Sequence, residues 1–308
     1  MGRRKKGIPI HGWLAIDKPL EISSNNVVGK VRWLTNAQKV GHGGTLDPLA
    51  SGILPLAFGE ATKTVSYVMD GSKTYRFTVC WGESRNTDDA EGVAVDTSDK
   101  RPSIDEIIAI LPDFLGVIEQ IPPIFSALKI DGQRAYKLAR EDADIKMTAR
   151  NVQIDRLELI ECPDSDHAIF EVDCGKGTYV RSLGRDFGVK LGCFGYISAL
   201  RRTKVGPFDE KCAISLDSLE DIVHSDALLN SLLAIETVLD DIPALALREE
   251  EARKIRQGIA LDVVAMADRL DFANMIADQV ISLMFEEKIV ALSRVVNGHV
   301  QPFRVFNL

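Results

Sequence analysis

A single carboxylate, Asp47, lies inside the glycine-rich segment GHGGTLDPLASG at residues 41–52. Glycine-rich loops often bind phosphate, but this one lacks the Gly-Lys-Ser/Thr sequence of a P-loop, and an acid at its centre would repel a phosphate. An ionised carboxylate on a permissive backbone could instead act as a nucleophile or a general base. Local chemistry favours a simpler alternative, because Asp47 followed by Pro48 is also a good helix start, with Asp47 as the N-cap.

Two further residues could serve the same chemistry. His42 lies five residues before Asp47, although a histidine in such a place is more often a packed or solvated ring than a catalyst. Arg181 falls in the first turn of a helix predicted within CGKGTYVRSLGRDFG. A cation at that end of a helix is unfavourable unless an anion lies nearby, so Arg181 hints at an acidic partner.

The composition is that of an ordinary globular protein of 308 residues, with 45% hydrophobic and 27% charged residues. This length predicts two domains. Apolar runs are too short for a membrane span, and the basic N-terminus lacks the apolar stretch of a signal peptide, so we expect a cytoplasmic protein without membrane association. The 5 cysteines and 5 histidines are scattered, which predicts reduced thiols and no metal site.

Charge is unevenly distributed along the chain, whose net charge is −8. Residues 217–308 carry 16 acids and 8 Lys or Arg, whereas residues 1–216 carry 29 of each and are neutral. Basic clusters in the neutral part can form a phosphate-binding face, although for each cluster taken alone a solvated surface is the better interpretation. These clusters include Lys129, Arg134, Lys137 and Arg140 in one segment, and Arg201 and Arg202 in another.

Apolar periodicity and capping signals predict strands and helices that intermix without a regular βαβ alternation, which indicates an α+β fold. A boundary near residues 239–247 precedes a C-terminal part in which a hairpin turns at Asn297–Gly298. Strands are predicted at residues 12–19, 73–82 and 167–174, and helix starts at Ser23 or Ser24, at Ser103 with Glu106 as a capping box, at Thr178 and at Ser215.

Six segments in a fixed order carry a resemblance to a known family: LAIDKP, KVGHGGTLDPLASGILPLAFGEATK, KTYRFTVCWG, QIPPIFSALKIDGQRAYKLAR, CGKGTYVRSLGRDFG and ISALRRTKVGPF. Over nearly its whole length the chain resembles the bacterial TruB type of tRNA pseudouridine-55 synthase. The resemblance implies an enzyme that isomerises uridine 55 in the tRNA T-loop to pseudouridine. It also implies a mixed, largely antiparallel sheet with flanking helices at residues 1–240, an RNA-gripping insertion at about 121–150, and a small PUA-like domain at residues 241–308.

This reaction explains why one acid is enough. Pseudouridine is an isomer of uridine, so no group or electron is exchanged and the resemblance implies no cofactor. Asp47 could add to C6 of the base, attack C1′ or deprotonate C2′, and the sequence leaves all three routes open. The implied partner is the T-stem-loop of tRNA, and we expect a monomer without an obligate protein partner.

The resemblance assigns a role to each matching side chain. Asp47 corresponds to the catalytic carboxylate, Arg181 to its ion-pair partner, and Tyr75 to the residue that stacks on the base and helps to remove the C5 proton. His42 corresponds to a residue that occupies the space vacated by flipped nucleotides, and Leu200 to an apolar pocket residue. The implied RNA-binding residues are Lys129, Arg134, Lys137, Arg140, Arg201 and Arg202. Without the resemblance, Tyr75 is an ordinary strand aromatic.

Three departures separate the chain from the family pattern. Gly43 stands where threonine is commoner, Phe125 replaces a tyrosine, and residues 262–285 are less strand-like than a PUA-like domain requires. Other classes explain less of the sequence. An aspartate-nucleophile phosphatase needs a second acid beside the first, and a non-catalytic RNA-binding module leaves the three catalytic candidates unexplained. A guide-dependent relative acting on ribosomal RNA shares the catalytic motifs, but the length and the insertion favour the stand-alone tRNA enzyme.

Overall fold

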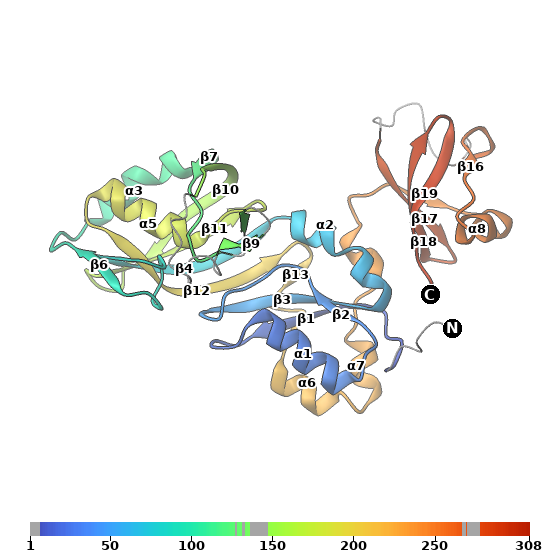
Figure 1. Cartoon of the computed structure of the whole chain (residues 1–308), viewed down its shortest axis with the longest axis horizontal. Helices are drawn as coiled ribbons and strands as arrows, with labels where there is room; N and C mark the ends of the chain where they lie inside the picture. Colours follow the sequence, from blue (N-terminus) through green and yellow to red (C-terminus); the bar gives the residue numbers. More distant parts are fainter. Residues whose placement is uncertain (1–6, 127, 131–132, 136–146, 267–268, 270–277) are drawn as a thin grey trace.

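A computed structural model describes residues 7–126, 128–130, 133–135, 147–266, 269 and 278–308. A long twisted sheet with helices occupies most of the molecule, and a smaller sheet lies at the end that carries the C-terminus (Figure 1). Among the described helices, none is long and apolar enough to cross a membrane.

Within the described residues, ten strands form the larger sheet. Two short strands, β2 (Val40–His42) and β13 (Phe208–Asp209), pair with β3 and β12. The β1–β14 and β3–β12 pairs are parallel and the others are antiparallel, so the predicted α+β fold with a mixed, largely antiparallel sheet is confirmed. The main path runs β14 (Ala213–Ser215), β1 (Gly12–Lys18), β3 (Ala50–Phe58), β12 (Gly195–Val205), β4 (Lys73–Trp81), β11 (His167–Cys174), β10 (Arg150–Glu161) and β7 (Gly116–Gln120).

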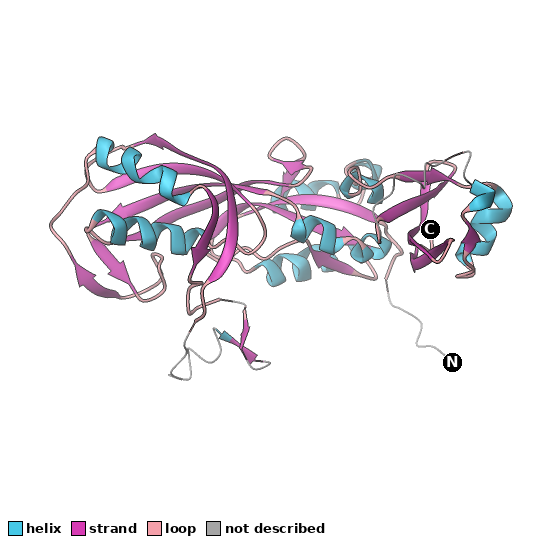
Figure 2. Ribbon diagram, turned by 90° about the horizontal axis from the view of Figure 1, so that it is seen from above, coloured by secondary structure: helices cyan, strands magenta, loops and turns pink. Residues whose placement is uncertain are grey.

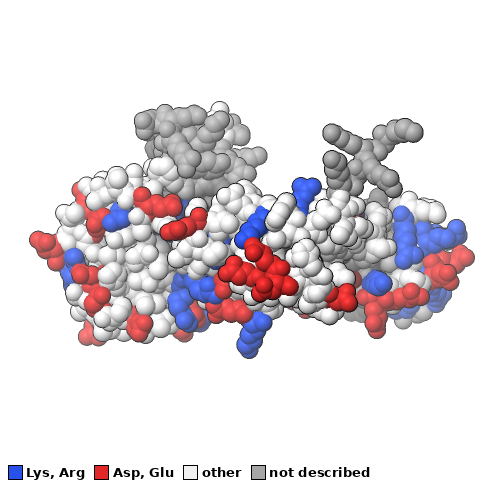
Figure 3. All heavy atoms as spheres, turned by 90° about the horizontal axis from the view of Figure 1, so that it is seen from below, with Lys and Arg blue, Asp and Glu red and all other residues white. Residues whose placement is uncertain are grey.

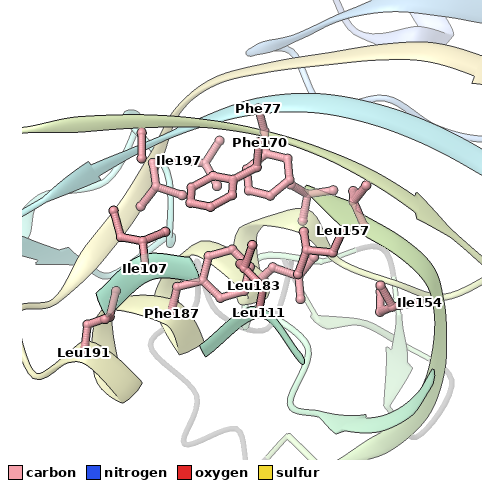
Figure 4. Packing of buried hydrophobic residues seen from close by; sticks show 14 of the residues in the cluster. Phe77, Ile107, Leu111, Ile154, Leu157, Phe170, Leu183, Phe187, Leu191 and Ile197 are labelled. Carbon is pink, nitrogen blue, oxygen red and sulfur yellow. The ribbon is translucent and has the colours of Figure 1, made fainter. Parts of the chain in front are cut away.

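One group of helices covers the β4–β11 half of the sheet: α3 (Ile104–Ile110), the 3₁₀ turn η2 (Leu111–Phe114) and α5 (Val180–Leu191). Strand periodicity buries one face of β4, and Phe77 stacks on Phe170 with ring centroids 5.4 Å apart. Phe187 of α5 packs against Phe170 at 5.2 Å (Figure 4). This aromatic core fixes α5 on the sheet.

Two glycines allow α5 to approach β12 closely. A Cβ at Gly184 would lie 2.6 Å from Ile197 Cδ1, and one at Gly188 would lie 2.2 Å from the Phe194 backbone. Because these two positions carry no side chain, the helix can lie directly against the sheet, and the backbone contact at Gly188 leaves no room for a Cβ. Its first turn, which carries Arg181, therefore reaches the edge of the loop that holds Asp47.

A second group of helices covers the other half of the sheet: α1 (Ser24–Thr35), α6 (Leu216–Ile222) and α7 (Asp226–Asn230) (Figure 1). The caps predicted at Ser23, Ser215 and Ser103 are confirmed, since Ser23 caps α1, Ser215 caps α6, and Ser103 forms a capping box with Glu106 at α3. The cap predicted at Thr178 is wrong, because Tyr179 is the N-cap of α5. Val27 and Val31 of α1 pack in one cluster with residues of β1 and β3.

The smaller sheet has the order β15 (Ala244–Ala246), β17 (Val280–Phe285), β18 (Lys288–Val296), β19 (His299–Val305) and β16 (Leu261–Asp262). The helix α8 (Glu249–Arg256) and the 3₁₀ turn η4 (Val264–Met266) accompany it. Asn297 and Gly298 have φ of 50° and 76°, so the predicted hairpin is confirmed. Residues 262–285 contribute β17, while 267–268 and 270–277 lie outside the described residues.

The two sheets are in contact. Leu292 and Phe306 pack in one cluster with Trp13 of β1 and Ile235 of the 3₁₀ turn η3 (Ile235–Val238). Lys63, which ends the 3₁₀ turn η1 (Gly59–Lys63), donates to the Val305 carbonyl at 2.6 Å. The helix α2 (Val65–Asp70) follows η1 directly. The C-terminal part therefore contacts the segment that leads to the cavity described below.

Two short hairpins complete the described elements: β5 (Glu83–Arg85) with β6 (Ala94–Thr97), and β8 (Lys129–Ile130) with β9 (Gln133–Arg134). The β8–β9 hairpin projects away from the sheet (Figure 2) and belongs to the predicted insertion.

Candidate active site

The loop that carries Asp47 connects β2 to β3 and is held from three sides. The Ser24 hydroxyl donates to the Leu46 carbonyl and accepts from the Leu46 amide, both at 2.8 Å. Lys18 donates to the Pro48 carbonyl at 3.4 Å, and Arg202 donates to the Gly44 carbonyl at 3.1 Å. Side chains from β1, α1 and β12 therefore replace the local hydrogen bonds that a helix would supply.

No helix follows Asp47, so the alternative of an N-cap is wrong. Pro48 and Leu49 form a turn in which the Ala50 amide donates to the Asp47 carbonyl at 3.0 Å, and β3 begins at Ala50. The reason is tertiary, because Gly52 pairs with Lys18 of β1 and with Arg202 of β12. The Asp47 side chain is 43% exposed and faces a cavity.

Arg181 brings four acceptors together. It is 6% exposed, and its Nη2 lies 2.8 Å from Asp47 Oδ2 and donates to the Phe125 carbonyl at 2.9 Å. Its Nη1 donates to the Thr87 carbonyl at 3.2 Å and lies 3.4 Å from Asp89 Oδ2. A cation at a helix N-terminus is thus accompanied by two carboxylates, as its position in the sequence suggests.

Asp89 is a site residue that the sequence does not single out. It is 5% exposed, and its Oδ1 accepts from the Thr87 hydroxyl at 2.5 Å and from the Glu91 amide at 3.1 Å. Its only sequence signal is its place in the acidic segment NTDDAEG, which reads as a solvated loop. Asp89 belongs to the site because the folded chain places it beside Arg181.

Asp47, Tyr75, Arg181 and Leu200 line one cavity of about 270 Å³. Tyr75, on β4, is half-buried, and burial raises the pKa of its hydroxyl, an effect that the Arg202 guanidinium opposes. Its hydroxyl is therefore protonated at neutral pH. Leu200 is half-buried on β12, in register with Phe77 of β4 and Ala50 of β3.

Lys73 lies on the wall of the same cavity and donates to the Met69 carbonyl at 2.5 Å and to the Gly71 carbonyl. Burial lowers its pKa to about 8. Lys73 is a second residue that sequence reasoning missed, since nothing in KTYRFTVCWG distinguishes it from a surface lysine at the start of a strand.

His42 lines an adjoining cavity of about 660 Å³ that also reaches Asp47 and Arg181. Its Nδ1 accepts from the Gly44 amide at 3.4 Å. Burial, and to a smaller extent the charge of Arg202, lower the pKa of the imidazole. At neutral pH His42 is therefore an uncharged ring.

The residues expected to bind RNA have different environments. Arg201 is paired with Asp17 at 2.9 Å and with Glu210 at 2.7 Å. Arg202 is 1% exposed and donates to the carbonyls of Ile53, Gly44 and Thr45. The prediction that Arg202 binds RNA phosphate is therefore wrong, because its side chain is buried beneath the Asp47 loop. Lys129 and Arg134 lie on β8 and β9, and Lys137 and Arg140 lie outside the described residues.

On the face shown in Figure 3, acidic side chains gather near the middle of the molecule, and the end formed by α8 and the smaller sheet carries basic side chains with acidic ones beside them. The last turn of α8 carries Arg253, Lys254 and Arg256. The net negative charge of the C-terminal part is therefore not spread uniformly over its surface.

Two family models match the chain. Residues 32–180 match the one described as TruB family pseudouridylate synthase (N terminal domain), and residues 181–240 match the one described as tRNA pseudouridylate synthase B C-terminal domain. The curated tRNA pseudouridine synthase B of Rhodospirillum rubrum is 49% identical over 308 residues, and the alignment covers 100% of this chain and 100% of the relative. That of Nitrobacter winogradskyi is 51% identical over 304 residues, or 97% of this chain and 83% of the relative.

Solved structures share the fold. One titled as the crystal structure of a Cbf5-Nop10-Gar1 complex aligns with a TM-score of 0.76 at 25% identity, over 100% of this chain and 91% of the other. A second, titled as an archaeal box H/ACA sRNP Nop10-Cbf5 complex, aligns with a TM-score of 0.72 at 22% identity, over 100% of this chain and 93% of the other.

Proposed function

The chain belongs to the TruB family of pseudouridylate synthases, and we infer that it isomerises uridine 55 in the T-loop of tRNA to pseudouridine, with Asp47 as the reacting carboxylate. The observation that carries this assignment is the 2.8 Å ion pair between Asp47 and Arg181 at the wall of a cavity that Tyr75 also lines. The enzyme is an isomerase that modifies RNA.

The reaction breaks the bond between N1 and C1′, turns the base and joins C5 to C1′. The proton on C5 is lost and N1 gains one, so the atoms balance without a cofactor. Asp47 can start the reaction by adding to C6, attacking C1′ or deprotonating C2′. Each route needs an oriented carboxylate, and the buried guanidinium of Arg181 orients it through a charge-assisted contact.

Tyr75 and Leu200 hold the flipped base. An enzyme that rebuilds a glycosidic bond must take the nucleotide out of its stack, and an aromatic ring can then bind the base by stacking. Because the Tyr75 hydroxyl is protonated at neutral pH, any part it takes in removing the C5 proton requires it to pass its own proton onward. His42, an uncharged ring in the adjoining cavity, fills space that neighbouring nucleotides leave.

The substrate class sets the other expectations. A folded T-loop presents unstacked bases, which are the usual targets of specific RNA recognition. Lys129, Arg134, Lys137, Arg140 and Arg201 are the proposed phosphate contacts. We propose that the enzyme works in the cytoplasm as a monomer without an obligate protein partner.

We assign residues 1–240 to a catalytic domain and residues 241–308 to a PUA-like domain. Support comes from the strands, because β14 is the last strand of the larger sheet and β15, at Ala244–Ala246, is the first of the smaller one.

Asp47→Asn tests the assignment. The amide keeps the shape of the side chain but cannot act as an anionic nucleophile or base, so turnover should fall by at least about a thousandfold. The measurement is release of tritium from T-arm RNA labelled at C5 of uridine, with RNA binding and thermal unfolding measured in parallel. Appreciable turnover by this variant would refute the role of Asp47, and loss of folding would point to a structural residue.

A further inference from the structure

We propose that Arg185 is a positioning residue of the active site and that, through an ion pair with Asp88, it holds the loop at residues 86–89 against Arg181. This inference rests on the proposed function, in which Arg181 orients the reacting carboxylate.

The Arg185 guanidinium joins three segments of the chain. Its Nη1 donates to Asp88 Oδ2 at 2.9 Å, its Nη2 donates to the Ile121 carbonyl at 2.8 Å, and its Nε donates to Asp186 Oδ1 at 2.9 Å. The Asp88 side chain is 13% exposed and that of Arg185 is 25% exposed, so this pair is shielded more than an ordinary surface ion pair.

Arg185 and Arg181 contact the same two segments. They are four residues apart on α5 and therefore lie on one face of the helix. Arg181 contacts Thr87 and Asp89 in the first segment and the Phe125 carbonyl in the second. Arg185 contacts Asp88 and Ile121 in those same segments, one helical turn farther from Asp47.

The loop has a specific need for this contact. Asp88 has a φ of 61°, in the left-handed region that aspartate and asparagine tolerate better than most residues. Its carbonyl accepts from the Ile197 amide and its amide donates to the Arg85 carbonyl, both at 3.1 Å, so the backbone is held from β12 and β5, and the Arg185 contact adds a hold from α5. Asp88 and Asp89 are adjacent carboxylates, and each lies beside its own guanidinium, Asp88 beside Arg185 and Asp89 beside Arg181.

The pair is not explained by stability. Burial raises the pKa of Asp88 to about 6, the charges of Arg185 and Arg181 oppose that rise, and the charge of Asp186 adds to it. A carboxyl whose folded pKa is raised favours the folded state when it is protonated, so an ionised Asp88 costs stability above about pH 6. A costly charge kept beside the site is expected where it positions a functional group.

Asp88→Asn tests the proposal on the full-length enzyme with T-arm RNA. Asparagine keeps the size of the side chain and its tolerance of the left-handed backbone, and it removes only the charge. We expect kcat to fall about tenfold, with KM unchanged within about twofold and a melting temperature at pH 7.5 that is no lower than that of the wild type. Asp186→Asn is the matched control, because it removes the other carboxylate on Arg185 without touching the loop, and its kcat should stay within about twofold.

The pH profile gives an independent readout. Wild-type kcat should decrease as the pH falls through about 6, where Asp88 is protonated, and Asp88→Asn should lack this limb. Arg185→Gln should lower kcat as much as Asp88→Asn, and the double variant should lower it no further. A wild-type kcat in Asp88→Asn overturns the proposal, and so does a loss of kcat matched by a loss of melting temperature. A wild-type enzyme that leaves the T-arm unmodified overturns the proposed function itself.

Discussion

Ser24→Ala should impair both catalysis and folding, because Ser24 holds the loop that carries Asp47. The Ser24 side chain is 2% exposed, and its hydroxyl makes two hydrogen bonds with the backbone of Leu46, the residue before Asp47. Alanine leaves a buried N–H and a buried C=O without partners, each of which costs about 1–3 kcal/mol. The loop can avoid part of this cost only by moving, and such a movement displaces Asp47.

The expected magnitudes follow from these contacts. The free energy of unfolding should fall by about 2–6 kcal/mol if the loop stays in place, and by less if it moves. A carboxylate misplaced by about 1 Å can lower the rate of the chemical step by about a hundredfold. We therefore expect kcat to fall ten- to a hundredfold with little change in KM, since Ser24 is buried and its hydroxyl bonds to the Leu46 backbone.

Single-turnover tritium release from T-arm RNA measures the chemical step, and urea unfolding measures the stability. Ser23→Ala is the matched control, because the Ser23 hydroxyl caps the same helix by accepting from the Asn26 amide at 3.2 Å, whereas the Ser24 hydroxyl bonds to the loop. That variant should lose about 1 kcal/mol of stability and keep its kcat. A wild-type kcat in Ser24→Ala, or an equal loss of kcat in Ser23→Ala, would refute the reasoning.

Two further predictions concern the pocket and its family departures. Tyr75→Phe keeps the stacking ring and removes the hydroxyl. Product formation in a tritium-release assay should therefore fall by orders of magnitude, while RNA affinity and melting temperature change little. Full activity would mean that Tyr75 only stacks on the base. Gly43→Thr should lower the free energy of unfolding, measured in urea, by about 1–3 kcal/mol, because a Cβ at position 43 would lie 2.8 Å from Val68 Cγ1. Adding Val68→Ala removes this obstacle and should restore part of the lost stability. Additive losses in that double variant would show that Val68 is not the obstacle.

Gly43 illustrates how a family departure acquires a physical reason. In this chain Val68 of α2 occupies the space into which a side chain at position 43 would project, and Trp13 Cζ3 would lie 3.4 Å from the same Cβ. Phe125 contacts Arg181 through its backbone carbonyl, an interaction that the missing tyrosine hydroxyl does not affect.

Local signals were sufficient where a few neighbouring residues decide the structure. The capping box at Ser103 and the turn at Asn297–Gly298 depend on hydrogen bonds and φ values within a few residues. They failed where a distant residue supplies the partner. Thr178 does not cap α5, because Tyr179 holds that position and its amide donates to Gln120 Oε1 of β7 at 2.8 Å.

The pair Arg201 and Arg202 shows the same limit on a strand. The alternation of side chains along a strand predicts that Arg201 and Arg202 point to opposite faces of the sheet and therefore have different surroundings. It does not say which face is covered. Only the packing of β12 between β3 and β4 buries Arg202 beneath the loop and leaves Arg201 to pair with Asp17 and Glu210.

By itself, the sequence determined the family, the elements with strong local signals, and Asp47, Tyr75 and Arg181 as the candidates for chemistry. Only the tertiary structure decided that a turn rather than a helix follows Asp47, and that Asp89 lies beside the same arginine, Arg181. The structure likewise placed Asp88 beside Arg185, which lies one turn after Arg181 on α5. The physical reason is sequence separation. Arg181 contacts residues that lie 94 and 56 positions away, and such contacts form only when the sheet brings those segments together.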